Sequence, residues 1–496
     1  MKSSSLKSSS LWVLVLLGVC VGSGGWGCDS SGASDDGSTV EGDVAWVVHQ
    51  SGDANDLAIY DDGAFVVVGE DKGAGQAFIT RYNKDRDEEW TLKTNGSGSA
   101  VAIAVAMLPD SSIAVTGMYE GMVSFEGAGT EESIAAQVDT DTDFFIVRVD
   151  VDGKLIWTMS GGCDVRAEVT DIVVTSDADI SVVGQFFGTM SFGNGAQVHT
   201  SLTVEGEQSQ DVFIARYDML GAFRWARFGQ AVEHPEARSE ITGAAALSDG
   251  GIAVVGTADV ALVLSDESQE RKVYSYTGTE MFLARFDAYG NIEWLERTYT
   301  EDYDDTEGVA ISVYGDDELV VAGSHRGVTA FDSDNSNEID FNSDIIFDSG
   351  TETAPFVASF GANGWFRWAE EIAVEETGQS NYITKLTTVS DNRFVTVGIT
   401  SGETVFGAGQ PGATILDQGH VPFVAVYDRT GTFEWVNYME MEDNLMLSGV
   451  TPFEGNAALI SGSFRGTLKL TPGADVPDEL EEFSMETRMF TLKMNL

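Results

Sequence analysis

The sequence predicts an all-β protein built from a repeated unit of four antiparallel strands. Two observations carry this prediction. A phrase with Phe and Trp twelve positions apart occurs six times, and a Val- and Ile-rich run that ends in glycine lies before each copy. No segment of ten or more residues combines the 3.6-residue periodicity of a helix with helix caps, so helical repeats and a Rossmann fold are excluded.

The repeated phrase is predicted to be a β-hairpin. In residues 145–157, FIVRVDVDGKLIW, extended apolar stretches flank Asp150 and Gly153. Asp accepts hydrogen bonds from the turn backbone and Gly three residues later tolerates positive φ, a combination typical of a type I turn followed by a left-handed residue. The complete copies span residues 78–90, 145–157, 213–225, 282–294, 356–368 and 423–435.

A second predicted hairpin precedes the first in each unit. Residues 241–256, ITGAAALSDGGIAVVG, consist of two apolar runs joined by a short polar turn, and the first run is apolar enough to be buried on both faces. Its closing glycine recurs as Gly69, Gly117, Gly184, Gly256, Gly323, Gly398 and Gly462. Each unit is therefore predicted to contain four strands, A to D, with the Trp on strand D.

Units of this kind, repeating at about 67 residues, predict a β-propeller, because such blades bury their faces only by stacking around an axis. Seven closing glycines and seven hairpin phenylalanines, of which Phe490 is the last, give seven blades. Only six residues follow Phe490, so the last blade lacks its own strand D. We expect residues 44–51 to supply that strand by pairing with residues 489–495, which would also remove two free sheet edges.

The tryptophans on strand D are predicted to dock against the neighbouring blade, where each would bury a large apolar area. They are Trp46, Trp90, Trp157, Trp225, Trp294, Trp368 and Trp435. Trp365 lies outside the pattern and is expected on the surface. The recurrent Arg81, Arg148, Arg216 and Arg285 share one position of strand C and indicate a repeated structural ion pair.

The N-terminus predicts export. Residues 1–28 contain Lys2 and Lys7 followed by an apolar stretch, residues 11–21, that is too short for a membrane-spanning helix and typical of a signal peptide. Cys28 resembles the lipidated cysteine of bacterial lipoproteins, although Gly25 and Trp26 depart from that pattern, and ordinary signal cleavage is the alternative. We expect a Ser/Gly/Asp tether over residues 29–42 and the propeller over residues 43–496. The protein would lie in the bacterial cell envelope or at the cell surface, and only a lipid anchor would attach it to the membrane.

The charge of the chain excludes some partners. Eighty acidic and 27 basic residues give a formal net charge of -53, which repels nucleic acid and anionic lipid at long range. With Cys28 lipidated and Cys20 removed, Cys163 would be the one remaining thiol, so no intramolecular disulfide is expected. We expect a monomer without nucleic-acid partners.

The pattern F-[IV]-[AV]-R-[YF]-D-x-x-G-x-x-x-W, with GQFFGTMSFGNG at residues 184–195, resembles the SBBP-type β-propeller repeats of exported bacterial proteins. The resemblance covers almost everything from Val44 onward and implies fold and location, not activity. Residues 428–435, DRTGTFEW, bear a more distant resemblance to the tryptophan-docking motif of pyrroloquinoline-quinone propellers. Those enzymes imply eight blades and a vicinal cysteine pair, and this sequence has neither.

No motif in the sequence identifies a catalytic residue or a cofactor site. The histidines, His49, His199, His234, His325 and His420, lack metal-ligand spacing, and nucleophile-elbow and phosphate-loop motifs are absent. The best metal candidate is residues 332–340, DSDNSNEID, where alternating oxygen ligands are similar to a calcium loop, but Asn337 and Ser343 replace the expected Gly and Glu. The bland alternative is an acidic loop, as for residues 139–143.

Two classes of function remain open. Strands B and C, and strands D and A, are joined by long acidic segments on one face of the disc, at residues 233–240, 263–280, 301–307 and 332–354. Because loops on rigid scaffolds carry function, this acidic long-loop face is the expected binding side for a protein or glycan. The alternative is a hydrolase or lyase with carboxylates at the central opening of that face. Drifted loops without a partner and a purely architectural role in the envelope are further alternatives.

Overall fold

The computed structural model describes residues 44–127, 130–135, 142–192, 197–200, 203–204, 207–232, 237–266, 268–300, 304–332, 344–374, 381–441, 444–454, 456–469, 479–481 and 487–496. Among these residues the regular structure is β-strand, and none lies in a helix long and apolar enough to span a bilayer. The predicted all-β class is therefore confirmed. The signal peptide, Cys28 and the tether lie outside the described residues.

Four-stranded antiparallel units recur along the chain, and we number them from unit 1. Unit 1 comprises β2 (Asp53–Ile59), β3 (Phe65–Asp71), β4 (Gln76–Tyr82) and β5 (Glu88–Gly96); unit 2, β6 (Ser99–Met107), β7 (Ile113–Glu120), β10 (Thr142–Val149) and β11 (Leu155–Cys163); unit 3, β12 (Arg166–Val174), β13 (Ile180–Phe187), β18 (Asp211–Tyr217) and β19 (Phe223–Ala231); unit 4, β20 (Ser239–Ala246), β21 (Ile252–Ser265), β22 (Glu270–Phe286) and β23 (Ile292–Arg297).

The remaining units follow the same strand order. Unit 5 comprises β25 (Asp305–Val313), β26 (Leu319–Phe331), β27 (Ile345–Phe360) and β28 (Phe366–Glu371); unit 6, β30 (Tyr382–Ser390), β31 (Arg393–Thr400), β34 (Val421–Asp428) and β35 (Phe433–Tyr438); unit 7, β37 (Asn444–Phe453), β38 (Ala457–Arg465), β41 (Arg488–Asn495) and β1 (Val44–Ser51). Unit 7 is thus built from both ends of the described chain, in the order β1-β41-β38-β37.

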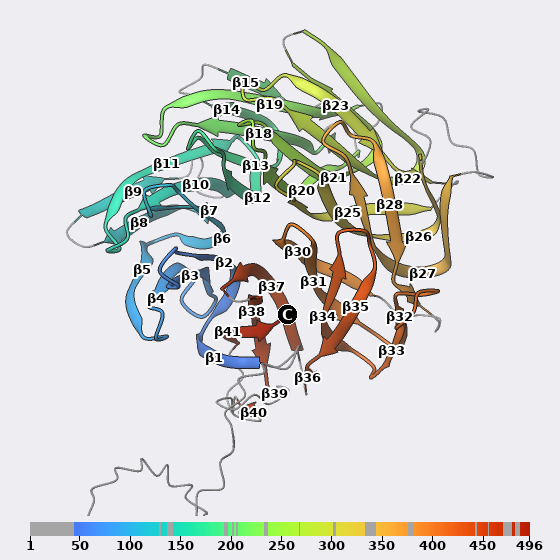
Figure 1. The fold of residues 1–496 in the computed structure, drawn as a ribbon. Helices are drawn as coiled ribbons and strands as arrows, with labels where there is room; N and C mark the ends of the chain where they lie inside the picture. The colour runs from blue at the N-terminus through green and yellow to red at the C-terminus, as the bar shows by residue number, and fades with distance from the viewer. Residues whose placement is uncertain are drawn as a thin grey trace, which may run out of the picture. The chain divides into compact units, whose positions relative to one another are not determined.

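The pairing predicted between residues 44–51 and 489–495 is present. β1 pairs antiparallel with β41, with Trp46 opposite Lys493 and His49 opposite Phe490. Phe490 and Leu492 are fully buried among apolar residues of units 6 and 7. Figure 1 shows β1 beside β41 and the units following one another round a common centre.

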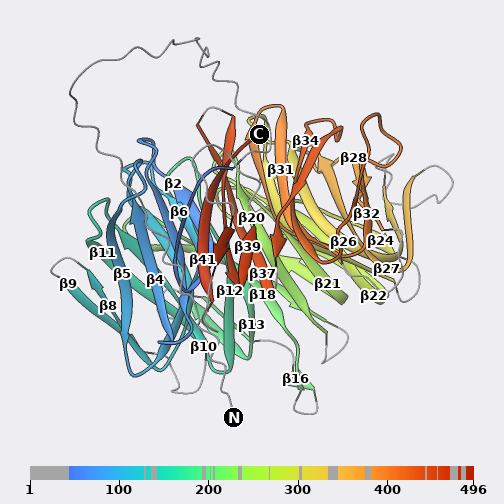
Figure 2. The same cartoon turned by 90° about the horizontal axis from the view of Figure 1, so that it is seen from below.

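The first strand of each unit lies at this centre. Contacts run from β2 to β6, β12, β20, β25, β30 and β37 in turn, and from β37 back to β2. Strands of neighbouring units run side by side in the view of Figure 2. The apolar clusters lie between neighbouring units, so each unit buries its faces against the next. Burial on both faces was predicted for strand A, but strands B and C have it, as in β3 and β4, whereas strand A includes partly exposed residues, as in β6 and β12.

The B–C segments, which were predicted to be long loops, contain additional strands. Residues 263–280 lie mainly in β21 and β22, which pair with each other over most of this stretch. Similar hairpins form from β8 (Met122–Gly127) with β9 (Thr130–Ala135), β14 (Thr189–Phe192) with β15 (Gln197–Thr200), β32 (Glu403–Phe406) with β33 (Thr414–Asp417), and β39 (Thr467–Lys469) with β40 (Glu479–Glu481). Alternating polar and apolar residues over these segments favour strands, a periodicity that length and acidity alone did not reveal.

Candidate functional site

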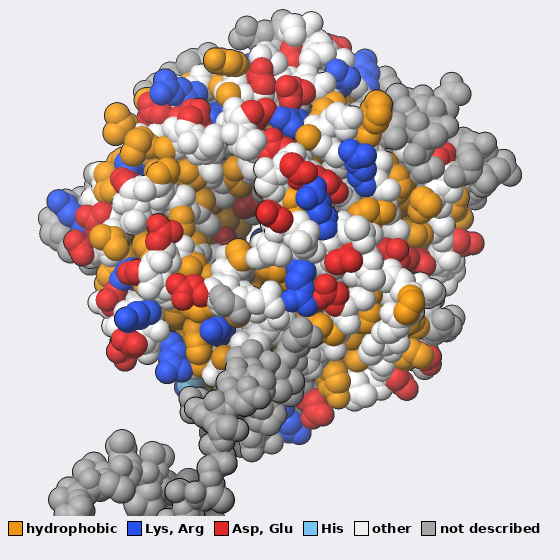
Figure 3. Space-filling model, in the orientation of Figure 1, with side chains coloured by type: hydrophobic (Ala, Val, Ile, Leu, Met, Phe, Trp, Pro, Cys, Tyr) orange, Lys and Arg blue, Asp and Glu red, His pale blue; other side chains and the backbone are white. Residues whose placement is uncertain are grey.

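Two faces of the unit assembly differ in how they hold the units together. The turn face carries the A–B and C–D turns, and the connection face carries the B–C and D–A segments. Figures 1 and 3 look onto the turn face, which is hollowed near its middle, with acidic and basic side chains beside the hollow. The side chains near the centre and those that join the units at each face determine which ligands or reactions the protein could support.

Every strand A has a β-bulge near its middle, and the residue that follows the bulge occupies an equivalent position in each unit. These following residues form what we call the central column: Asp56, Ala104, Asp171, Gly243, Ala310, Lys385 and Gly449. Small residues fit where strands converge. A Cβ at Gly449 would lie 2.5 Å from Leu57 Cδ2 in unit 1 and 2.5 Å from Ser461 Oγ, so a side chain here would displace these groups.

The two acidic members of the central column bind the backbone of the next unit. Asp56 Oδ2 accepts a hydrogen bond from the Val105 N–H at 2.9 Å, and Asp171 Oδ2 accepts one from the Ala244 N–H at 2.9 Å. The other oxygen of Asp171 accepts from the Ile172 N–H at 2.8 Å. Both carboxylates therefore act as fasteners between successive units.

Burial raises the pKa of Asp56 to about 6; Lys385 acts against this shift and Asp171 adds to it. Burial likewise raises the pKa of Asp171, and Lys385 again opposes the shift. A carboxyl that titrates near neutrality at the centre of the molecule has the property of a general acid or base. Its hydrogen bonds, however, hold it against the neighbouring backbone.

Four of the bulged residues connect the same strands. Their side chains donate to a carbonyl oxygen of the next unit: Asn55 Nδ2 to Ala102 at 2.7 Å, Thr170 Oγ1 to Ile241 at 2.6 Å, Thr242 Oγ1 to Gly308 at 2.8 Å and Ser448 Oγ to Ala54 at 2.5 Å. The last of these bonds joins unit 7 to unit 1. Ala54 also donates from its N–H to Ser463 Oγ at 3.0 Å, so the junction between the chain ends is bonded in both directions.

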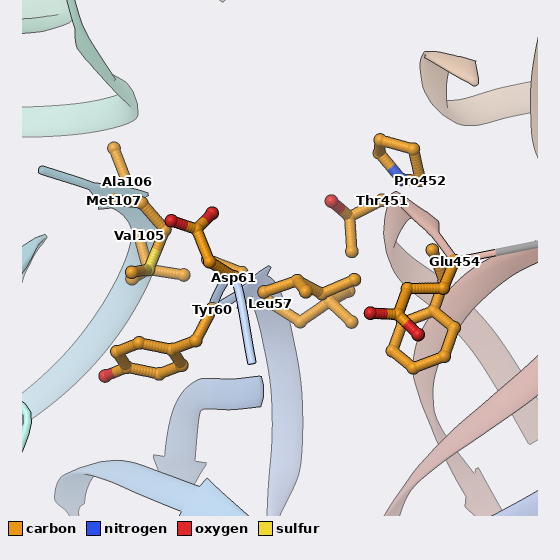
Figure 4. Close-up of a pocket in the computed structure, with 12 residues that line it drawn as sticks. Leu57, Tyr60, Asp61, Val105, Ala106, Met107, Thr451, Pro452 and Glu454 are labelled. Atoms are coloured by element: carbon orange, nitrogen blue, oxygen red, sulfur yellow. The ribbon is translucent and has the colours of Figure 1, made fainter. Parts of the chain in front are cut away.

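A pocket of about 510 Å³ opens between units 7, 1 and 2 on the turn face. Its floor is apolar, with Leu57, Val105 and Met107, whereas Asp61 and Glu454 lie on opposite sides of it (Figure 4). Its other lining residues, including Thr451 and Pro452, belong to the strand ends of β2, β6 and β37. The pocket offers two carboxylates and the hydroxyl groups of Tyr60 and Thr451 on an apolar base, with no Lys, Arg, His or Cys among its lining residues.

Tryptophans on strand D dock against the next unit, with the indole N–H donating to a carbonyl oxygen of its C–D turn. The bonds are Trp90 to Val151 at 2.9 Å, Trp157 to Met219 at 3.1 Å, Trp225 to Ala288 at 3.1 Å, Trp294 to Ala362 at 3.0 Å and Trp368 to Arg429 at 3.0 Å.

The remaining two tryptophans flank the junction between the chain ends. Trp46 stacks on Phe65 of unit 1 at 5.7 Å between ring centroids. The Nε1 of Trp435 is buried without a hydrogen-bond partner among the described residues. The cause is that unit 7 has no C–D turn, since β41 and β1 come from opposite ends of the chain. Trp365 is exposed, as expected.

The recurrent arginines of strand C bind the A–B turn of their own unit, and Arg148, Arg216 and Arg285 also donate to a carbonyl oxygen of the next unit. Arg216 is fully buried and contacts Asp179 Oδ2 at 3.1 Å, Asp177 Oδ1 at 2.8 Å and the Gly250 carbonyl of unit 4 at 2.6 Å. Arg148 pairs with Asp110 at 2.5 Å, Arg285 with Asp249 at 2.6 Å, and Arg81 with Asp62 at 3.5 Å. The prediction of a repeated structural ion pair is confirmed.

The described histidines are held by single polar partners. His199 Nε2 lies 2.8 Å from Asp211 Oδ2, His325 Nε2 lies 2.8 Å from Glu371 Oε1, and His420 Nδ1 lies 2.8 Å from Ser401 Oγ. His49 lies on β1, and burial lowers its pKa. His234 and residues 333–340 of the calcium candidate lie outside the described residues. Within the described ranges, no group of three or more His, Cys, Asp or Glu side chains could hold a metal ion.

Sequence reasoning missed Asp56, Asp171 and Lys385. A signal for them exists, because each member of the central column lies thirteen residues before the closing glycine of its unit. In this column three charged residues interrupt four positions held by Ala or Gly. The apolar pattern of strand A does not reveal these residues, because their signal appears only when equivalent positions of different units are compared.

Comparisons with known proteins supply no family. No family model matches the chain, and no curated protein matches it. Similar solved structures include a protein of unknown function from Dyadobacter fermentans, with 11% identity over 91% of this chain and 100% of that one and a TM-score of 0.39. The WD40 domain of SCAP from fission yeast has 9% identity, coverage of 90% and 97%, and a TM-score of 0.33. Puromycin hydrolase has 11% identity, coverage of 86% and 60%, and a TM-score of 0.34. At such identities and TM-scores these likenesses say nothing about activity.

Proposed function

We propose that the protein is an exported binding or scaffold module, a seven-bladed β-propeller closed by its N-terminal strand, that engages a protein or glycan through the connection face. The contacts of the first strands, which return from β37 to β2, support the closed ring. The ladder between β1 and β41 supports the proposed role of the N-terminal strand. The repeat resemblance to SBBP-type proteins is part of the same proposal.

The location belongs to the proposal as well. The basic and apolar segments of residues 1–28 support export, and Cys28 supports a lipid anchor in the cell envelope. A tether over residues 29–42 would then join the anchor to β1. Mass spectrometry of the mature N-terminus tests this part: an acylated Cys28 supports it, and an unmodified N-terminus refutes the anchor while leaving export in place.

One observation carries the choice of binding over catalysis. The carboxylates of Asp56 and Asp171 each accept a hydrogen bond from a backbone N–H of the neighbouring unit. Groups committed in this way stabilise the assembly and are poorly placed to exchange protons with a substrate. The connection face instead carries hairpins of different length in different units, a variation that suits partner recognition on a constant scaffold.

The binding proposal is tested by trimming the connection face. Residues 333–343, between β26 and β27, are replaced by a short Gly/Ser linker, and a matched control replaces Ala288 and Tyr289 in a C–D turn of the opposite face by Gly and Ser. Proteins and glycans from the envelope are captured on both variants, and the affinity for each identified partner is measured by calorimetry. We expect weaker binding in the first variant and in variants with other segments of the connection face trimmed, and unchanged binding in the control. Unchanged affinity after every such trim refutes the proposal.

A second candidate, a carboxylate-dependent hydrolase or lyase, is favoured by the raised pKa values of Asp56 and Asp171. The corresponding experiment measures turnover of a panel of glycosides and esters by the wild type and by Asp56→Asn. Turnover that follows an ionisation near pH 6 and disappears in the variant would select the enzyme. We expect no such turnover.

A further inference from the structure

The junction between unit 7 and unit 1 differs from the other junctions on the connection face. In each of units 1 to 6, the fifth and sixth residues after the docking Trp pair with a strand that the next unit contributes from its B–C segment. The pairs of residues are Asn95 and Gly96, Gly162 and Cys163, Gln230 and Ala231, Tyr299 and Thr300, Ala373 and Val374, and Glu440 and Met441. An added strand is thus the regular way in which this face joins two units.

At the remaining junction the equivalent residues, counted from Trp46, are Ser51 and Gly52. Unit 1 contributes no strand to them, because its B–C segment is a tight turn in which the Ala74 and Gly75 N–H groups both donate to the Asp71 carbonyl oxygen. A pocket of about 680 Å³ occupies this place and is lined by Ser51, Gly52, Asp53, Lys72, Arg465 and other residues. No described residue pairs with the outer edge of β1 here.

The backbone of Ser51 faces this edge. The Gly52 N–H donates to the Thr487 carbonyl oxygen at 3.2 Å, on the inner side next to β41. Because backbone groups of successive strand residues point to opposite sides, the N–H and carbonyl of Ser51 point to the outer edge. The equivalent residue in unit 1, Asn95, uses the same edge: it lies opposite Ser124, whose Oγ donates to the Asn95 carbonyl at 3.4 Å.

The charges at this junction indicate what kind of strand would fit. Arg465 is exposed and has no ion-pair partner among the described residues. Lys72 reaches over the pocket from the tight turn of unit 1 and pairs with Asp53. In a chain of formal net charge -53, an unpaired guanidinium beside a free strand edge favours a partner that brings a carboxylate.

We propose that this junction binds an extended segment of a partner protein, which adds as an antiparallel strand to Ser51 and Gly52 and places an acidic side chain against Arg465. The inference rests on the proposed binding function and names its partner class. The strands at the other junctions indicate the pattern of the segment, since the buried Val123 and Phe125 of β8 alternate with polar residues. Main-chain bonds would supply affinity, and side chains on alternate positions would supply specificity.

The test uses a fluorescein-labelled peptide with the sequence of residues 120–135, which contains the β8–β9 hairpin and several glutamates. Binding to the full-length mature protein is followed by fluorescence anisotropy. Ser51→Pro removes the outward N–H, and Arg465→Glu reverses the charge at the site. We expect at least a tenfold loss of affinity in each variant. Ser51→Ala, the matched control, keeps the N–H and should bind like the wild type, and Arg465→Lys should retain most of the affinity.

Three results would overturn the assignment. The first is equal affinity of all variants for the peptide, and the second is the absence of saturable binding up to about 1 mM peptide. The third is a wild-type protein that sediments as a dimer and that Ser51→Pro converts to monomers, because a second copy of the chain would then occupy the site. Thermal unfolding of Ser51→Pro is measured as well. If Ser51→Pro does not fold, the affinity of Arg465→Glu for the peptide tests the proposal. An envelope partner that binds the wild type and both variants equally would leave the proposed function standing and remove only the strand-addition site.

Discussion

Replacing Arg216 by methionine should destabilise the protein strongly, because this guanidinium is fully buried and joins unit 3 to unit 4. Its Nη1 donates to the Gly250 carbonyl at 2.6 Å, and its other nitrogens bind Asp179 at 3.1 Å and Asp177 at 2.8 Å. The Asp179 side chain is only 17% exposed and would be left without its cation, whereas Asp177, at 53%, can be hydrated. Removing one partner of a buried ion pair costs about 3 to 5 kcal/mol.

A matched control comes from the same unit. Arg224 Nη2 lies 3.2 Å from Asp218 Oδ2, but the Arg224 side chain is 53% exposed, and exposed pairs contribute about 0 to 1 kcal/mol. Methionine fills the volume of the arginine stem in both variants, so the comparison isolates the buried charge and its bonds.

The assay for both variants is urea unfolding, followed by tryptophan fluorescence and far-UV circular dichroism. The change in unfolding free energy is taken from the midpoint and slope, provided that the two probes give one transition. The reasoning fails if Arg216→Met costs less than about 1 kcal/mol, or no more than Arg224→Met. Equal losses would mean that burial of the guanidinium at the junction does not distinguish it from a surface pair.

Three further predictions follow from the junctions. Trp225→Phe should cost about 1 kcal/mol more than Trp435→Phe in urea unfolding, because only Trp225 loses an indole hydrogen bond; equal costs would contradict it. Gly153→Ala should lower the melting temperature more than Gly63→Ala, since both have positive φ but only a Cβ at 153 would meet an indole ring, at 2.8 Å; a similar melting temperature for the two would argue against the docked geometry. Burial raises the pKa of Asp56 from 3.8 to about 6, so the folded state holds an extra proton between these values, and the contribution of this group to the free energy of unfolding falls as the pH rises from about 4 to 6. Asp56→Asn should flatten that fall and stabilise the protein at pH 8 by on the order of 1 to 2 kcal/mol. An unchanged pH profile of the free energy of unfolding would contradict the assignment.

The elements within a unit were predictable because each depends on local sequence. Gly153 has the positive φ of the predicted C–D turn, and the Asp150 carbonyl accepts its N–H at 3.1 Å. The pairing of β1 with β41 was also predictable, because each strand alone is an incomplete repeat and the two complete each other.

The joints between units were not predictable in the same way. Asp56 reads as one acidic residue among eighty, and its role appears only when the bulge of β2 brings it to the Val105 N–H. Residues 263–280 extend the hairpin of β21 and β22, for which alternating residues give a local signal, but the pairing of β21 with β19 of unit 3 leaves no signal within unit 4. Long-range pairing of this kind depends on the positions of whole units, which local periodicity does not encode.

The two irregular joints flank unit 7 and have different causes. On the turn face, unit 7 has no C–D turn, so the Trp435 indole N–H has no carbonyl to bind among the described residues. On the connection face, unit 1 has a tight B–C turn, so Ser51 and Gly52 have no added strand. Unit 7, which contains strands from both ends of the described chain, is held by the Ser448 hydroxyl bond to Ala54 and by the β1–β41 ladder. The junction without an added strand on the connection face has a pocket and, among the described residues, an arginine without an ion-pair partner. Recognition is therefore better sought here than at the six junctions that the chain fills itself.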